Sequence, residues 1–168
     1  MINFSGHITP NWNSTDYHDL NYKQATIHPL YLDRYVAAGH NCDQIKVWNY
    51  FEPNPMPKSI NYIKQQFKNL KFLSSAVNLM LPGQYLPHHS DLYERWMLFH
   101  NVTDIANVYR AIVMLDNSVS GQILQIDANT IDHWQAGDWF AWTGKTSHAI
   151  YNFSTENRYA IQLTGLIL

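Results

Sequence analysis

A histidine and an aspartate two positions apart, His89 and Asp91, are the residues of this sequence best suited to chemistry. In an extended strand, side chains two residues apart point to the same face, so this imidazole and this carboxylate can reach one point. A metal ion needs a further ligand, and His148, on a predicted strand 57 residues after Asp91, can supply it. Two imidazoles and one carboxylate on one face of an octahedron leave three adjacent positions open, an arrangement associated with non-haem Fe(II) oxygenases.

The other histidines carry no comparable pattern. His88 is adjacent to His89 and is expected to point away from it, because neighbouring side chains of a strand face opposite ways. The remaining six have no nearby carboxylate at a repeated ligand spacing and are expected to be ordinary surface or loop residues: His7, His18, His28, His40, His100 and His133.

An arginine follows His148 by ten residues, after a turn predicted at Ser154–Asn157. This residue, Arg158, opens an apolar strand, where a guanidinium is unfavourable unless it meets an anion. Arginine binds carboxylates through two parallel hydrogen bonds and stays charged when it is partly desolvated. Arg158 is therefore the candidate anchor for an anionic cosubstrate, and a surface ion pair with Glu156 is the alternative.

His89-x-Asp91, then His148, then Arg158 resembles the iron- and 2-oxoglutarate-dependent dioxygenases. The segment Leu81–Asp91 is similar to the approach to the first ligand in the aspartyl/asparaginyl β-hydroxylase-like and prolyl hydroxylase-like branches. Gly137–Trp142, followed by His148, Asn152 and Arg158, resembles the end of the same domains. The resemblance covers about residues 74 to 168, and no family motif is recognised in the first 70 residues.

The resemblance implies a role for each matching residue. His89, Asp91 and His148 would ligate Fe(II), and Arg158 would bind the distal carboxylate of 2-oxoglutarate. Arg110 stands where the aspartyl/asparaginyl branch places an arginine that assists cosubstrate or substrate.

One position departs from the pattern of these relatives. Many of them carry a serine two residues after the anchoring arginine, and this sequence has Ala160 there. A hydroxyl partner for the cosubstrate would then come from elsewhere, with Tyr85 or Thr164 as candidates.

The implied reaction uses Fe(II), 2-oxoglutarate and O2, and it hydroxylates a C–H bond with release of succinate and CO2. The implied substrate is an amino acid, a peptidyl side chain or another small metabolite. Two alternatives remain open. One is a cupin-type metalloenzyme that does not use 2-oxoglutarate, and the other is a non-catalytic β-sandwich binding module.

The elements expected around these residues are mainly β. Ile60, Ile63, Phe67 and Leu70 recur at helical spacing and predict a helix over Ser59–Leu70, and a shorter helix is expected at Leu30–Ala38. A first strand is expected at Gln44–Phe51. Short segments divided by Gly, Asn, Asp and Ser predict further strands: Ser74–Leu81, Tyr85–His89, Arg110–Leu115, Gln122–Ile126, Asp138–Trp142, Ser147–Phe153 and Arg158–Leu168.

Closely spaced strands without intervening helices are typical of a double-stranded β-helix, the jelly roll of the cupins. We therefore expect one domain over residues 1–168. It would have an N-terminal elaboration with supporting helices at 1–73 and the catalytic jelly roll at 74–168. The stretch Leu92–Val108 has no clear period and is expected to be a long loop or lid.

Composition excludes several classes of protein. The 168 residues are 46% hydrophobic and 14% charged, so a sizeable core is expected and disorder is not. A net charge of −2 argues against a basic nucleic-acid-binding surface. One cysteine, Cys42, excludes an intramolecular disulfide, and no apolar run approaches the roughly 18–20 residues of a membrane helix. With no signal-peptide pattern at the N-terminus, a cytoplasmic protein that binds neither nucleic acid nor membranes is expected.

Overall fold

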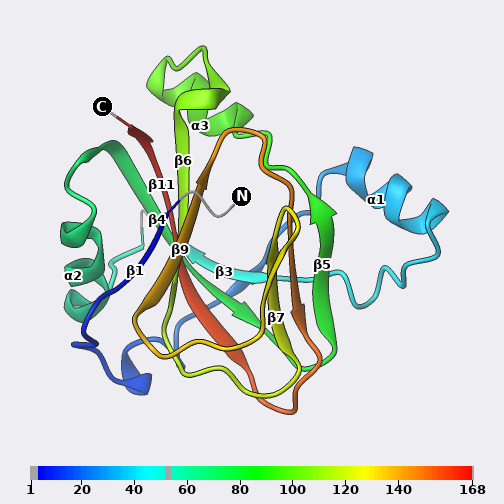
Figure 1. The fold of residues 1–168 in the computed structure, drawn as a ribbon, viewed down its shortest axis with the longest axis horizontal. Coiled ribbons are helices and arrows are strands. Elements are labelled where there is room, and N and C mark those ends of the chain that lie inside the picture. Colours follow the sequence, from blue (N-terminus) through cyan, green and yellow to red (C-terminus); the bar gives the residue numbers. More distant parts are fainter. Residues whose placement is uncertain (1–3, 52–53, 168) are drawn as a thin grey trace.

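Two antiparallel β-sheets face each other in the computed structural model, which describes residues 4–51 and 54–167 (Figure 1). The larger sheet has the order β1-β9-β6-β11-β4-β3-β2, and the smaller has the order β5-β10-β7-β8. The strands of the larger sheet are β1 Phe4–His7, β2 Lys23–Gln24, β3 Trp48–Phe51, β4 Leu70–Met80, β6 Val108–Met114, β9 Asp138–Thr143 and β11 Arg158–Ile167. Those of the smaller sheet are β5 Gln84–His89, β7 Gln122–Ile126, β8 Asn129–Ile131 and β10 His148–Asn152. The expected mainly β, cupin-like jelly roll is confirmed.

The larger sheet is covered on both faces, and alternate residues of its strands belong to different apolar cores. On β6, Ala111 and Val113 join the core beneath α2, whereas Ile112 and Met114 join the core between the two sheets. Every residue of β6 is buried, as expected for a strand with no solvent-facing side. The even-numbered face of β6 therefore looks into the interior of the jelly roll.

Among the described residues, three α-helices flank the sheets: α1 Pro29–Ala37, α2 Lys58–Gln66 and α3 Glu94–His100. Ile60 and Ile63 of α2 are fully buried against the larger sheet, and α1 lies on the other side of the molecule, outside β5 (Figure 1). The expected helix at Leu30–Ala38 is confirmed within one residue at each end. The helix expected over Ser59–Leu70 forms but ends at Gln66, and Leu70 instead begins β4. The stretch Leu92–Val108, expected to be a long loop or lid, contains α3 and a single turn of 3₁₀ helix at Ile105–Asn107. Another single turn of 3₁₀ helix lies at Ser14–Asp16.

A tight turn carries the chain from the larger sheet to the smaller one. The amide of Gln84 donates to the carbonyl of Leu81 at 3.1 Å, with Pro82 and Gly83 between them. Gly83 has a φ of +78°, which suits glycine at the third position of a type II turn. The turn sends β5, with His89 at its end, across to the smaller sheet.

The N-terminal region contributes more than helices. Residues before position 74 supply β1, β2, β3 and the first part of β4, so the larger sheet is complete only with them. Residue 74 therefore does not separate an elaboration from the β core. The expected strand Gln44–Phe51 is shortened to β3, and the last residue of the expected final strand, Leu168, lies outside the described residues.

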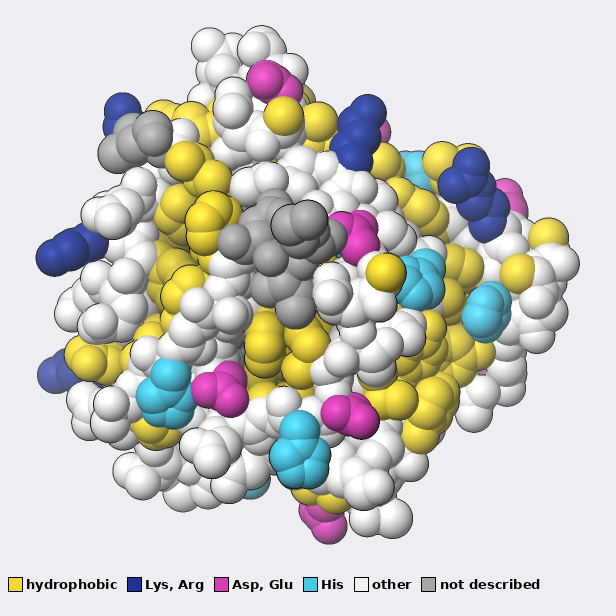
Figure 2. Space-filling view, viewed as in Figure 1, with side chains coloured by type: hydrophobic (Ala, Val, Ile, Leu, Met, Phe, Trp, Pro, Cys, Tyr) yellow, Lys and Arg dark blue, Asp and Glu magenta, His cyan; other side chains and the backbone are white. Residues whose placement is uncertain are grey.

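Charged side chains are sparse on the face seen in Figure 2. Lys and Arg side chains are scattered towards its edges and do not gather into a patch. Within residues 4–51 and 54–167, the structure contains no helix that is both long and apolar enough to cross a membrane.

Candidate metal centre

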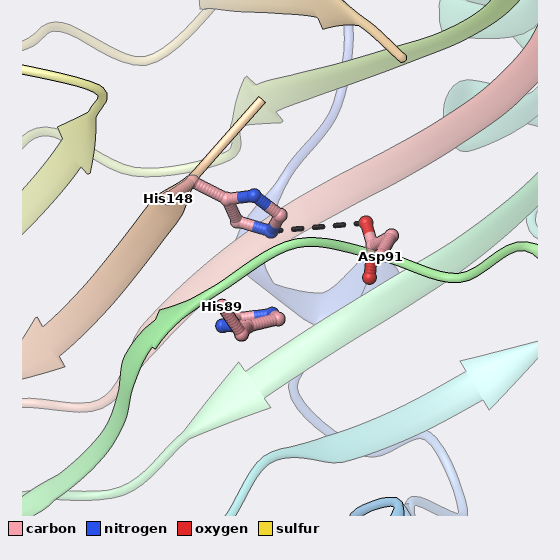
Figure 3. Close-up of side chains that lie close together, drawn as sticks. All are labelled: His89, Asp91 and His148. Atoms are coloured by element: carbon pink, nitrogen blue, oxygen red, sulfur yellow. Dashed lines mark ion pairs between the residues drawn. The ribbon is translucent and has the colours of Figure 1, made fainter. Parts of the chain in front are cut away.

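His89, Asp91 and His148 lie together at one end of the jelly roll (Figure 3). One ligand atom from each of them lies within 4.8 Å of those of the other two. His89 is the last residue of β5, Asp91 lies in the loop just after it, and His148 is the first residue of β10. Because His148 pairs with His89 across the smaller sheet, the backbone register itself places the two imidazoles side by side.

A β-bulge in β5 aims His89 at the interior. His148 pairs with His89, and Ile150 pairs with Leu86. Between these two pairs β5 has one residue more than β10, which is the extra residue of the bulge. Leu86 faces the core between the sheets, and simple alternation would turn His88 inward next. The bulge reverses that order. His88 is exposed and its imidazole contacts the side chains of Gln125 at 3.0 Å and Ser147 at 3.3 Å, as expected for a side chain that points away from the site.

Backbone carbonyls fix which nitrogen of each imidazole is free. Nδ1 of His89 lies 2.8 Å from the carbonyl oxygen of Pro87, and Nδ1 of His148 lies 3.1 Å from that of Thr146. A carbonyl oxygen only accepts, so both Nδ1 atoms carry a proton and donate it. The Nε2 atoms are therefore left with lone pairs, the form in which histidine binds a metal.

Asp91 is held by a buried arginine. Nη2 of Arg110 lies 3.0 Å from Oδ2 of Asp91, and the same oxygen lies 3.7 Å from Nε2 of His148. The guanidinium carbon of Arg110 lies 4.9 Å from the centre of the Tyr93 ring. Nε and Nη1 of Arg110 are buried without a hydrogen-bond partner within the described parts of the chain. Arg110 is therefore at the site, engaged with a predicted ligand and covered by an aromatic ring.

The charges of the site follow from burial and from this pair. Burial would raise the pKa of Asp91, but Arg110 and then the two imidazoles outweigh it and lower that pKa to about 2. Burial lowers the pKa of His148 to about 4, even though Asp91 acts in the opposite direction. At neutral pH the site thus presents a carboxylate and a neutral imidazole, the protonation states that a divalent metal ion requires.

The three residues open onto a cavity of about 620 Å³. Its walls combine apolar side chains with a few polar ones, and Trp142 lies beneath His148 with 4.7 Å between the ring centres. The larger sheet contributes Arg110 and Ile112 from β6 and Gln162 and Thr164 from β11. A cavity of this size suits a small-molecule or side-chain ligand.

Arg158 is buried among residues of the core between the two sheets. Its Nη2 lies 3.4 Å from Sδ of Met114, and its guanidinium carbon lies 5.5 Å from the centre of a ring of Trp134. Its Nε has no hydrogen-bond partner among residues 4–51 and 54–167. No carboxylate of the described residues lies within ion-pair distance of it, so the surface pair with Glu156 does not form. Burial lowers the pKa of Arg158 to about 10, and its side chain does not line the cavity in this structure. A buried cation without an anion is unfavourable and is the feature that a carboxylate ligand would relieve.

The structure brings one of the two candidate hydroxyls to the cavity. Thr164 lines it, because even-numbered residues of β11 face inward, as Arg110 does opposite Thr164 on β6. Tyr85 lies on the other face of β5, in a separate cluster with Tyr35 and Ile45, and its hydroxyl lies 3.5 Å from Nδ1 of His40. The structure therefore does not bring Tyr85 to the cavity.

Several lining residues were not anticipated from the sequence. His28 and Tyr31 reach the cavity from the N-terminal region, and Tyr93 and Trp96 reach it from the start of α3. These residues have no spacing pattern relative to the ligands, and only the packing of α1 and α3 at this end of the barrel reveals them.

A family model described as Aspartyl/Asparaginyl beta-hydroxylase matches residues 39–164, three quarters of the sequence. The chain belongs to this family. The match includes His89, Asp91, Arg110, His148 and Arg158, and it begins well before the region in which the sequence motifs lie. No curated protein matches the sequence significantly.

Comparison with solved structures finds a similar fold with a TM-score above 0.5 and two weaker likenesses. A Pseudomonas putida prolyl-4-hydroxylase is 14% identical to this family member, with a TM-score of 0.55 over 92% of this chain and 96% of that one. KdgF from a Halomonas species is 8% identical, with a TM-score of 0.47 over 90% and 91% of the two chains. A predicted oxalate decarboxylase from Thermotoga maritima is 12% identical, with a TM-score of 0.44 over 73% and 82%.

Family membership and the gathered His-Asp-His cluster together support a cupin-fold oxygenase with a candidate metal site.

Proposed function

We propose that this protein is an Fe(II)- and 2-oxoglutarate-dependent oxygenase. It would hydroxylate a C–H bond of an amino acid, a peptidyl side chain or another small metabolite. In the balanced reaction, 2-oxoglutarate, O2 and the C–H compound give succinate, CO2 and the corresponding alcohol. The observation that carries the proposal is the combination, inside one jelly roll, of a two-histidine, one-carboxylate cluster and a buried arginine, Arg158, that pairs with no carboxylate in the part of the chain that the structure describes.

The donor set fits ferrous iron. His89 and His148 offer neutral Nε2 atoms, and Asp91 offers a carboxylate whose pKa is held at about 2. Three protein ligands leave positions open for other molecules, as in the facial triads of non-haem iron enzymes. When bound there, ferrous iron together with 2-oxoglutarate and O2 supplies the oxidising chemistry, while the chain's own residues bind, orient and shield the reactants.

Arg158 is the residue proposed to bind the distal carboxylate of 2-oxoglutarate. It faces the interior of the sandwich from the end of β11 remote from Thr164, so the cosubstrate would lie along the barrel between the metal ligands and this guanidinium. Ile112, Ile150 and Trp142 line the cavity and belong to the apolar core between the two sheets. Such walls exclude water and strengthen the interaction of a buried guanidinium with a carboxylate.

Arg110 is proposed to orient Asp91. Its Nη2 is committed to Oδ2 of Asp91, and its remaining nitrogens are buried beside the Tyr93 ring. Arg110 also lines the cavity, so the role expected for it from the family, assistance to cosubstrate or substrate, is compatible with this one.

The test is anaerobic addition of Fe(II) and 2-oxoglutarate, followed by exposure to air. The proposal predicts a visible charge-transfer band that needs both additions, and succinate formation in air. The band should be lost in Asp91→Ala and should require more 2-oxoglutarate in Arg158→Met. Metal binding without any band or succinate would favour the cupin metalloenzyme that does not use 2-oxoglutarate, and absence of metal binding would favour a binding module.

A further inference from the structure

Two tyrosines of α1 donate hydrogen bonds to backbone carbonyls on either side of His89. The hydroxyl of Tyr31 donates to the carbonyl oxygen of Ser90, the residue between the two predicted ligands of this segment. The hydroxyl of Tyr35 donates to the carbonyl oxygen of Pro87 at 3.4 Å. That carbonyl is also the one that accepts from Nδ1 of His89. One helix is thus bonded to the backbone both before and after His89.

Local sequence explains why α1 presents both tyrosines to β5. His28 caps the helix by accepting from the amide of Leu30, and Pro29 occupies the first helical position, where its missing N–H is not needed. Tyr31 and Tyr35 are four residues apart, so they share a face of the helix, and their rings stack with 6.2 Å between centres. Figure 1 shows this helix outside β5, on the side of the molecule opposite α2.

The strand that carries the ligands needs outside support. β5 is an edge strand of the smaller sheet, with β10 as its one strand partner there. An edge strand leaves a row of backbone groups without strand partners, and a bulge further interrupts the pairing of β5. The side of β5 away from β10 is bonded by the carbonyl of Gln44, which accepts from the amide of Tyr85, and then by the tyrosine hydroxyls of α1.

Tyr31 also contacts a ligand side chain directly. Its ring lies edge-on to the imidazole of His89, with 6.0 Å between centres and 70° between planes. The carbonyl of Ser90 accepts from Tyr31, and the hydroxyl of Ser90 donates to the carbonyl of Lys145 at 2.9 Å. The turn that joins His89 to Asp91 is therefore fixed at both its backbone and its side chain.

We infer that Tyr31 and Tyr35 are positioning residues of the metal centre, holding His89 and Asp91 in the orientation in which both can ligate one ion. This inference rests on the proposed metal site. It assigns to the N-terminal helix, for which the sequence offered no role, the setting of metal affinity from outside the ligand set. Partners outside the ligands of a metal site commonly contribute about 10–100-fold to its affinity.

The test compares Tyr31→Phe, Tyr35→Phe and Tyr22→Phe for binding of Co(II) under titration, with the visible spectrum of the bound Co(II) as a second readout. Tyr22→Phe is the matched control. The hydroxyl of Tyr22 also donates to a backbone carbonyl, that of Tyr17 at 2.6 Å, but it does so at the core beneath α2. Each substitution removes one hydroxyl and keeps the ring.

Tyr31→Phe should weaken Co(II) binding about 10–100-fold and alter the spectrum of the bound ion, with a smaller effect for Tyr35→Phe, whose hydrogen bond is longer. Tyr22→Phe should lower the melting temperature at least as much as Tyr31→Phe while leaving Co(II) affinity unchanged. If the wild-type protein binds Co(II) and both α1 variants bind it with the same affinity and spectrum, the inference is overturned although the metal site stands. If the wild-type protein does not bind Co(II), the proposed function itself fails. Should Tyr31→Phe not fold, Tyr35→Phe alone decides by the same two readouts.

Discussion

Asp91 and Arg110, which both line the cavity, form an ion pair with 3.0 Å between Oδ2 and Nη2. Arg110 is almost completely buried, while the Asp91 side chain keeps 25% of its surface exposed, and Asp91 is among the residues that line the cavity. The pair therefore lies between the protein interior and the space where a metal and its ligands would bind. In the metal-free protein, each of these two residues should therefore change the contribution of the other to the free energy of unfolding.

Removing either partner of this pair should destabilise the metal-free protein. The losses of unfolding free energy in the two single variants should add up to more than the loss in the double variant. Asp91→Asn leaves Arg110 buried without an anion, and breaking one side of a buried pair typically costs about 3–5 kcal/mol. Urea unfolding of Asp91→Asn, Arg110→Met and the double variant would give the coupling energy. Additive effects within about 0.5 kcal/mol would show that the pair contributes nothing beyond its separate residues.

The adjacent histidines offer a matched pair of variants for the ligand assignment. His89→Ala should abolish Mn(II) binding, because it removes one of three ligands, whereas His88→Ala should bind Mn(II) as the wild type does. His88 is exposed and bonded to Gln125, away from the site. Calorimetric titration measures both. Loss of Mn(II) binding in His88→Ala with retention in His89→Ala would mean that the bulge of β5 aims the other imidazole at the ion.

Arg158→Met should change stability and cosubstrate binding in opposite directions. The apolar side chain removes a buried cation that has no carboxylate partner in the described structure, so the melting temperature of the metal-free protein should rise. Binding of 2-oxoglutarate to the metal-loaded protein should weaken by roughly 10- to 100-fold, the value of a charge-assisted hydrogen bond of about 1.5–3 kcal/mol. Thermal denaturation and a 2-oxoglutarate titration provide the two readouts, with Arg34→Met as the control, because Arg34 is exposed on α1 and does not line the cavity. Unchanged 2-oxoglutarate affinity in Arg158→Met would remove the proposed anchor.

Gly137 should not tolerate a side chain, because it combines a φ of +93° with a close backbone contact. A Cβ at this position would come within 2.0 Å of the carbonyl oxygen of Ile8, just after β1. Gly137→Ala should therefore cost more than the roughly 1–3 kcal/mol of backbone strain alone. Gly39→Ala is the control, since Gly39 has a φ of +84° but open space around its Cβ position. Equal losses of unfolding free energy in the two variants would show that the packing of the N-terminal strand on this turn is unimportant.

The ligand set could be anticipated from the sequence because its members follow local rules. His89 and Asp91 are two positions apart, and the strand segments around His89 and His148 have β-forming composition, so both were placed near strand ends. The gathering of the three residues agrees with that expectation, although Asp91 lies beyond the end of β5 and not within it. The bulge that makes His89 the inward residue has no signal in the sequence that distinguishes it from regular alternation.

The rest of the site depends on contacts between distant segments. Tyr31 and Trp96 reach the cavity because α1 and α3 pack at the end of the barrel where the ligands lie, and no periodicity relates them to His89. The same holds for β1 and β2, short strands without an alternating pattern that form only against partners elsewhere in the chain. Tyr85 was a candidate hydroxyl partner for the cosubstrate in place of the serine that Ala160 replaces, but the bulge puts Tyr85 and His89 on different faces of β5.

The most direct test of the metal centre is a crystal structure of the protein grown with Mn(II) under anaerobic conditions, with the metal located by its anomalous scattering. The account predicts one strong peak at coordination distance from Nε2 of His89, Nε2 of His148 and a carboxylate oxygen of Asp91 together. A fully occupied peak elsewhere in the protein, with these three side chains unligated, would contradict it.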